Sequence, residues 1–214
     1  DVDADAMIHN GTITGGNSGG GAGGIHIDDD AKVVLNDVHI VGNVSDEDDG
    51  GGIAIYDGAS LIMNGGSFKN NSIAGSFSTS EHVMFARSYY GGAIYVENTA
   101  SVVNITDAVF SRNTATNGGA ICVASGKVNV VGGSFDENDA TSSGGAICVY
   151  PSTLELKDVV FNGNEAPYGG AVGNNGATVN VTGSTQFKNN VASYRGGAID
   201  ITKSDDVTGR LTMT

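Results

Sequence analysis

The sequence predicts an all-β protein, a parallel β-helix in which short strands of successive coils stack on one another. The first observation is a repeat, Phe-x-x-Asn followed by Gly-Gly-Ala-Ile or a close variant, which returns about every 26 residues and gives about seven coils. The second is composition, because 34 Gly against 2 Pro suits tight turns and excludes collagen. The third is the alternation of apolar residues that marks strands with one buried face. A single coil cannot bury its apolar face alone, so the coils must stack.

The first predicted strand of each coil follows the glycine pair, which suits a sharp turn with little room for a Cβ. Two apolar residues of this strand should point inward, and the residue between them should point outward. The inward pairs are Ile25/Ile27, Ile53/Ile55, Ile94/Val96, Ile121/Val123, Ile147/Val149 and Ile199/Ile201. The outward residues are chemically mixed, which predicts a solvated face, and they are His26, Ala54, Tyr95, Cys122, Cys148 and Asp200.

The second predicted strand precedes the Phe and alternates in the same way. Its inward pairs are Val33/Leu35, Leu61/Met63, Val103/Ile105, Val128/Val130, Leu154/Leu156, Val179/Val181 and Leu211/Met213. Ala6 and Ile8, with Ile13, form a weaker first copy.

The third element is the corner in which an apolar residue is followed three positions later by Asn. It occurs at Ile40…Asn43, Phe68…Asn71, Phe110…Asn113, Phe135…Asn138, Phe161…Asn164 and Phe187…Asn190. If coils stack at the usual strand separation of about 4.8 Å, each Phe lies on the next Phe and each Asn on the next Asn. Stacked rings would then fill the core, and an Asn ladder would satisfy buried backbone groups. Stacking alone therefore explains these residues, and we expect none of them to be catalytic.

Four full copies of the motif pair begin at Phe110, Phe135, Phe161 and Phe187. A fifth copy begins at Phe68 and is split by an insertion. This pattern resembles the repeat pair of the chlamydial polymorphic outer membrane proteins and of related microbial repeat adhesins. The first two coils depart from it, since Ile40 stands in place of Phe, and Gly24-Ile25 and Gly52-Ile53 in place of Ala-Ile. The resemblance implies a right-handed parallel β-helix displayed outside the cell, often as an autotransporter passenger, with adhesion as its usual role.

The length and the charge of the chain limit its possible domain organisation and its possible partners. We expect residues 1–214 to form one β-helix domain of a longer, extracellular or cell-surface protein, with further domains in the same chain. The formal charge of −14 argues against nucleic acid as a partner. The absence of a run of about 18 apolar residues predicts no membrane-spanning segment in this piece.

Acidic residues gather in predicted turns at Asp28-Asp29-Asp30, Asp46-Glu47-Asp48-Asp49 and Asp205-Asp206. Solvated loop charge explains them. The alternative is calcium binding by hard oxygen ligands, although no loop has the spacing of a known calcium motif. Apart from calcium at these turns, the sequence predicts no metal and no cofactor.

One coil carries an insertion, because 19 residues (72–90) separate Asn71 from Gly91, where other coils use 4 to 6. A long loop on a rigid scaffold is a usual position for a binding surface, and aromatics with an Arg form binding hot spots. The alternative is that Val83, Met84 and Phe85 cover the flank of the helix. The candidate binding residues are Phe77, His82, Phe85, Arg87, Tyr89 and Tyr90.

Cys122 and Cys148 occupy equivalent positions one coil apart. In-register stacking brings their Cα atoms into the range of a disulfide, but parallel strands do not orient the two Cβ atoms ideally. A disulfide and a pair of reduced neighbours therefore both remain open. Tyr90, Tyr168 and Tyr194 recur just before glycine pairs, where they serve either turn packing or sugar stacking.

Catalysis is not expected. The outward carboxylates Asp200 and Glu155 fall in different columns, and neither has an acidic neighbour one coil away, as a glycosidase or polysaccharide lyase would need. We therefore expect a non-catalytic adhesin or passenger segment that presents its loop and outer faces to a host protein or glycan. The alternatives are a structural spacer with no ligand of its own and, less favoured, a polysaccharide lyase or glycosidase.

Overall fold

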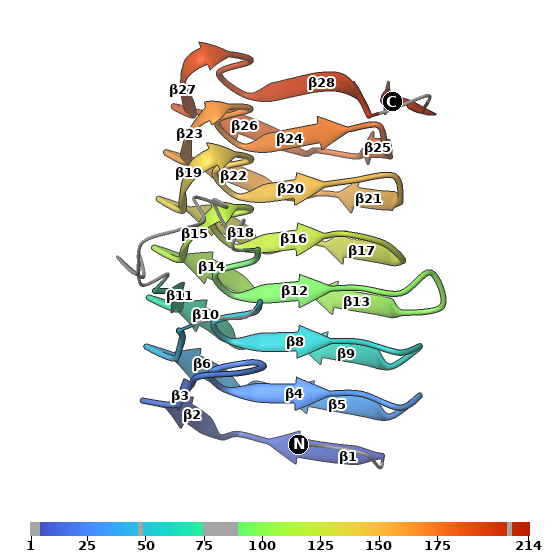
Figure 1. The fold of residues 1–214 in the computed structure, drawn as a ribbon. Helices are drawn as coiled ribbons and strands as arrows, with labels where there is room; N and C mark the ends of the chain where they lie inside the picture. The colour runs from blue at the N-terminus through green and yellow to red at the C-terminus, as the bar shows by residue number, and fades with distance from the viewer. Residues whose placement is uncertain (1–4, 47–48, 75–89, 205–206) are drawn as a thin grey trace, which may run out of the picture.

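The protein is a stack of coils in which every long-range pairing of successive coils is parallel (Figure 1). The computed structural model describes residues 5–46, 49–74, 90–204 and 207–214. Strands of sheet A run from left to right at the front of Figure 1, strands of sheet B return behind them, and the coils rise from the N-terminus to the C-terminus. This is a right-handed path, which the twist of strands favours for parallel crossovers. The prediction of an all-β, right-handed parallel β-helix is confirmed.

Four sheets, here called A to D, form the walls of the solenoid. Sheet A contains β4 (Ile25–Ile27), β8 (Ile53–Ile55), β12 (Ile94–Val96), β16 (Ile121–Val123), β20 (Ile147–Val149), β24 (Val172–Asn175), β28 (Ile199–Ser204) and the antiparallel β29 (Val207–Thr208). Sheet B contains β1 (Ala6–His9), β5 (Lys32–Asn36), β9 (Ser60–Asn64), β13 (Val102–Thr106), β17 (Lys127–Val131), β21 (Thr153–Lys157), β25 (Thr178–Thr182) and β30 (Arg210–Met213).

Sheets C and D are built from the predicted corner, which is not a simple turn but two further short strands. Sheet C contains β2 (Thr12–Thr14), β6 (His39–Val41), β10 (Ser67–Lys69), β14 (Val109–Ser111), β18 (Ser134–Asp136), β22 (Val160–Asn162) and β26 (Gln186–Lys188). Sheet D contains β3 (Asn17–Ser18), β7 (Val44–Ser45), β11 (Ser72–Ile73), β15 (Thr114–Asn117), β19 (Asp139–Ser143), β23 (Glu165–Tyr168) and β27 (Val191–Arg195). The part of the chain that the structure describes contains no helix that could cross a membrane.

The core is formed by the predicted inward residues of sheets A and B, which are almost completely buried in the middle coils. The last coil differs, because Ile201 and Met213 are 43% and 57% exposed. No described coil lies beyond them to cover their side chains. The stacked Phe rings fill the remaining space, with centroids 4.6 to 4.9 Å apart from Phe68 through Phe110, Phe135 and Phe161 to Phe187.

The predicted Asn ladder is present and runs through the corner between sheets C and D. In the middle of the ladder, Asn138 Nδ2 donates to Asn164 Oδ1 and to the Phe110 carbonyl, both at 3.0 Å. Asn138 Oδ1 accepts from the backbone N–H of Asn113 at 3.0 Å and from Asn113 Nδ2 at 2.9 Å. The same pattern joins Asn43, Asn71, Asn113, Asn138, Asn164 and Asn190. The ladder therefore satisfies backbone groups that would otherwise be buried without partners.

Each glycine of the pair is required for a different structural reason. Gly144 has a φ of +66°, a left-handed conformation that favours glycine. At Gly145 a Cβ would overlap the backbone oxygens of Gly170 and Glu165 in the next coil. The first glycine thus makes the turn, and the second permits the close approach of stacked coils.

Candidate functional site

The outer face of sheet A is the part of the solenoid surface that departs most from the sequence expectation. Its outward column runs in register from His26 through Ala54, Tyr95, Cys122, Cys148 and Gly173 to Asp200. The prediction of a solvated face is wrong for the middle of this column, where Ala54, Cys122 and Cys148 are fully buried and Tyr95 is 5% exposed. His26 and Asp200 are half-buried.

Aromatic side chains from turns and loops form the cover of this column. Tyr95 contacts the Tyr56 ring at a centroid distance of 5.7 Å and the Tyr90 ring at 5.9 Å. Tyr90 also meets Tyr150 edge-on at 5.8 Å. Together with Cys122 and Cys148, these tyrosines form a hydrophobic cluster outside the main core. We call Tyr56, Tyr90, Tyr95 and Tyr150 the tyrosine cluster.

Within the tyrosine cluster, Tyr95 and Tyr150 hold their hydroxyl groups in the neutral state. Burial, with the charges of Asp49 and Glu97 adding to it, raises the pKa of Tyr95 far above its usual value. Burial and the neighbouring Cys148 raise the pKa of Tyr150 in the same direction. Both phenols therefore act as hydrogen-bonding groups with an apolar ring, and neither suits a role as a base at neutral pH.

The two cysteines lie side by side beneath this cover, paired in register between β16 and β20. Both are free thiols in the structure, and both are buried. Burial raises the pKa of Cys122, whereas hydrogen bonds from Cys122, Ser143 and other neighbours lower the pKa of Cys148. Whether the pair oxidises to a disulfide stays a prediction.

The insertion meets the tyrosine cluster at its last residue. β11 ends at Ile73, and the chain returns at Tyr90, which forms an isolated parallel bridge with Asn117. Five of the six candidate binding residues lie outside the described residues, namely Phe77, His82, Phe85, Arg87 and Tyr89. Tyr90 is half-buried and is placed between Tyr95 and Tyr150. The expectation of a binding loop, like its alternative as a core cover, remains a prediction.

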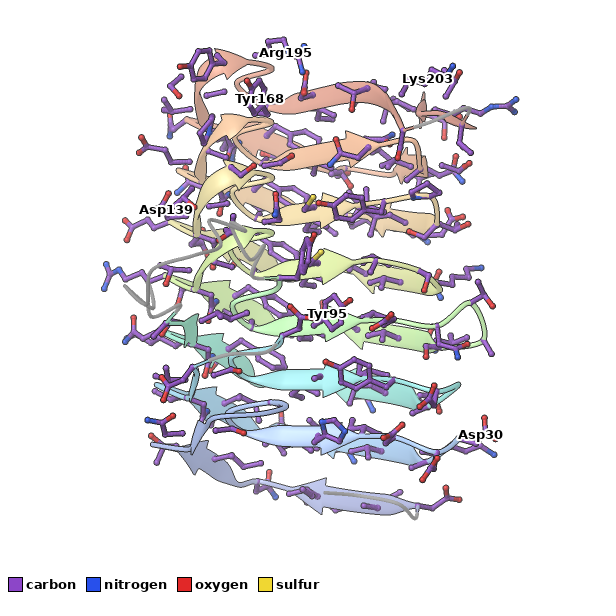
Figure 2. The ribbon with its side chains drawn as sticks, viewed as in Figure 1. Asp30, Tyr95, Asp139, Tyr168, Arg195 and Lys203 are labelled. Atoms are coloured by element: carbon purple, nitrogen blue, oxygen red, sulfur yellow. The ribbon has the colours of Figure 1, made fainter. Side chains whose placement is uncertain are left out.

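The predicted tyrosine row before the glycine pairs divides into two groups. Tyr90 joins the tyrosine cluster, whereas Tyr168 and Tyr194 stack on each other at 5.5 Å. The Arg195 guanidinium lies 4.9 Å from the centre of the Tyr168 ring. Figure 2 labels Tyr168 and Arg195 in neighbouring upper coils.

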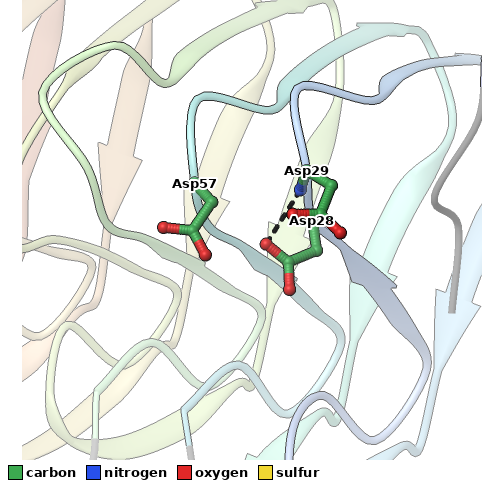
Figure 3. A group of neighbouring side chains, drawn as sticks. All are labelled: Asp28, Asp29 and Asp57. Atoms are coloured by element: carbon green, nitrogen blue, oxygen red, sulfur yellow. Dashed lines mark hydrogen bonds between the residues drawn. The ribbon is translucent and has the colours of Figure 1, made fainter.

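Acidic side chains come together at one of the predicted turns. Asp28, Asp29 and Asp57 place carboxylate oxygens within 4.8 Å of one another, and Figure 3 shows the three side chains at adjacent turns. Asp28 Oδ1 accepts a hydrogen bond of 2.9 Å from the backbone N–H of Asp29. Three hard oxygen donors are the ligands that calcium prefers, yet a calcium site usually takes 6 to 8. Calcium binding at this turn therefore stays a prediction.

The predicted outward carboxylates are separate, as expected. Glu155 in sheet B accepts from Asn180 Nδ2 at 3.0 Å, and Asp200 in sheet A pairs with Arg195 at 3.4 Å. Sheet D contains a pair of acids that was not predicted, because Asp139 and Glu165 are in register there. Partial burial and then the charge of Glu165 raise the pKa of Asp139. Both side chains are exposed, and neither lines the two grooves formed by Tyr56, Glu97 and their neighbours and by Tyr168, Asp200 and their neighbours.

Sequence reasoning also missed Tyr56 and Tyr150 as cover for sheet A. Both directly follow the last residue of a sheet A strand, after Ile55 and Val149. This recurrence in two coils is the signal that could have identified them.

A family model described as the Chlamydia polymorphic membrane protein repeat matches residues 107–124, 132–150 and 184–202. No curated protein and no solved structure matches the chain. The three matches contain the motif pairs that begin at Phe110, Phe135 and Phe187. The pair that begins at Phe161 has the same strand register and ring stacking as its matched neighbours. The chain therefore carries repeats of the Chlamydia polymorphic membrane protein type, and these repeats build a parallel β-helix.

Proposed function

We propose that this β-helix is a segment of a surface-displayed, autotransporter-like passenger and that it acts as a non-catalytic adhesin for a host protein or glycan. The repeat type supports the surface location. Further domains of the same chain would supply export and anchoring. The adhesive role rests on the features of the segment that stacking does not require.

The observation that carries the adhesive role is the interruption of the repeat beside the tyrosine cluster. Stacking accounts for the Phe and Asn residues, but it requires neither 19 residues between Asn71 and Gly91, where other coils use 4 to 6, nor the aromatic cover of sheet A. The insertion returns to the scaffold at Tyr90, in contact with Tyr95 and Tyr150. A long loop that is anchored on a rigid aromatic base is suited to contact a partner.

The carboxylate arrangement supports a non-catalytic role. Glu155 and Asp200 belong to different sheets, and each is held by a partner of its own. Asp139 and Glu165 are in register but exposed, which favours contact with water over an enclosed site that would shield a sugar. We therefore favour a non-catalytic role over that of a glycosidase or lyase.

The test is adhesion of the purified protein to host cells. A variant with Phe85→Ala, Arg87→Ala and Tyr89→Ala should lose adhesion and keep the thermal unfolding midpoint of the parent. The matched control is Ile62→Ala with Val131→Ala, two side chains on the outer face of sheet B that are each 41% exposed. Unchanged adhesion in the loop variant would place the binding site elsewhere. Absence of adhesion by the parent would favour the structural spacer.

A further inference from the structure

The upper part of the solenoid has a groove on the outer side of sheet A that no part of the repeat explains. Its volume is about 350 Å³, within the range of about 300–1,000 Å³ that is usual for ligand pockets. The residues that carry the argument are Ser143, Tyr150, Tyr168, Asn175, Arg195 and Asp200. They come from the last three full coils, so the groove lies at the opposite end from the acidic turn of Figure 3.

The groove lies beside two columns of residues that stack in register, one in sheet A and one in sheet D. In the outward column of sheet A, Gly173 stands between Cys148 and Asp200 and has no side chain. In sheet D, Ser143 precedes Tyr168, and Arg195 follows it. The tyrosine cluster ends at Tyr150, and beyond it Ser143, Tyr168 and Arg195 line the groove.

Tyr168 forms one wall and is held in position by the coil above it. Tyr194 stacks on its ring at 5.5 Å with an interplanar angle of 16°. Arg195 lies over the same ring, and its Nη2 atom is 3.4 Å from Asp200 Oδ2. These contacts restrict the rotamers of both side chains before any ligand arrives, which lowers the entropic cost of binding.

Two further lining residues, Asp200 and Asn175, carry hydrogen-bonding groups. Asp200 lines the groove with a side chain that is only 12% exposed. Asn175 is fixed by two contacts, as its Nδ2 donates to Cys148 Sγ at 3.4 Å and its Oδ1 accepts from Thr202 at 2.9 Å. The second N–H of this amide remains a donor for a ligand.

We propose that this groove binds a sugar ring of a glycan. A sugar ring has an apolar face of C–H groups, which suits Tyr168, and a rim of hydroxyl groups, which suits the Asp200 carboxylate and the Asn175 amide. Arg195 supplies further donors at the same wall. Leu, Ile, Val, Met and Phe are all absent from the lining, so the groove lacks the apolar anchor pocket that a peptide side chain would need.

This inference deepens the proposed adhesive function by naming the ligand class and a site apart from the insertion. The experiment applies the protein to an array of neutral, sialylated and uronic-acid glycans and then measures the best ligand by calorimetry. Tyr168→Ala should weaken binding at least about tenfold, because the wall for the apolar face is lost. Asp200→Asn keeps the shape of the side chain and should weaken binding by a similar factor through loss of the charged acceptor. Glu155→Gln on sheet B is the control and should bind like the parent.

Two results would overturn the inference. The first is that no glycan binds while the protein still adheres to host cells, which would leave the adhesive function intact and point to a protein ligand. The second is that a glycan binds equally well to Tyr168→Ala and Asp200→Asn, which would place the sugar site elsewhere. Loss of all adhesion by the parent would instead refute the proposed function.

Discussion

The Asn ladder gives the sharpest quantitative prediction, at Asn138 in its middle. Asn138→Ala removes two hydrogen bonds that the side chain donates and two that its Oδ1 accepts. Asn164 Oδ1 keeps one donor, because the backbone N–H of residue 138 still reaches it. The Phe110 carbonyl and two N–H groups of Asn113 each lose a partner in a region from which water is excluded.

The magnitude follows from those lost partners. A buried donor or acceptor without a partner costs about 1–3 kcal/mol, so we expect the free energy of unfolding to fall by roughly 3–5 kcal/mol. Urea denaturation measures this change. Amide hydrogen exchange provides a local readout, because the backbone N–H of Asn113 should lose protection more than amides two coils away.

The matched control is Asn129→Ala on the outer face of sheet B. Asn129 makes one side-chain hydrogen bond, donating to Asn104 Oδ1 at 2.7 Å in a partly exposed position. Its loss should cost below about 1 kcal/mol, because water can replace the partner. If both variants unfold at the same urea concentration, or if Asn113 keeps its protection, the ladder is not a major source of stability and the reasoning fails.

Three further predictions concern the scaffold. Phe135→Ala should lower the free energy of unfolding by about 3–5 kcal/mol, measured by urea denaturation, since it opens a cavity between two stacked rings; a loss below about 1 kcal/mol would contradict this. Gly145→Ala should lower the thermal midpoint because its Cβ overlaps the next coil, whereas Gly19→Ala, with open space around it, should not; equal midpoints would refute the packing argument. Asp139→Asn should stabilise the protein at pH 7, because the folded state raises the pKa of Asp139 and so disfavours its charged form. The gain should disappear below the unfolded pKa of 3.8, and urea titrations that show the same gain at pH 3 and pH 7 would exclude this cause.

Much of the scaffold was predictable because its information is local and repeated. The spacing of Phe-x-x-Asn and the glycine pair sets the length of a coil, and equal coils can stack only with like residues in register. Ring stacking at Phe135 and the amide contacts of Asn138 follow directly from that register. The sequence did not show that the corner forms two strands, since β18 and β22 are only 3 residues long and carry too little alternation.

The candidate sites were less predictable, because burial of an outward residue depends on what other coils place over it. Cys122 and Tyr95 have the alternation of a solvated strand face, yet Tyr56, Tyr90 and their neighbours cover them from elsewhere in the chain. The alternation therefore gave the direction of these side chains correctly but not their burial.

The sequence by itself determined the solenoid, its coil length and its Phe and Asn columns, because period and composition leave one way to bury the apolar faces. Only the tertiary structure decided where the outer surface is covered and where it is open. Ser143, Tyr168 and Arg195 are far apart in the sequence, but stacking places them one above another in sheet D, where they line a groove. The physical reason is that side chains from several coils form a groove. The register of the stacked coils brings these side chains together, and the sequence of a single coil does not specify the arrangement.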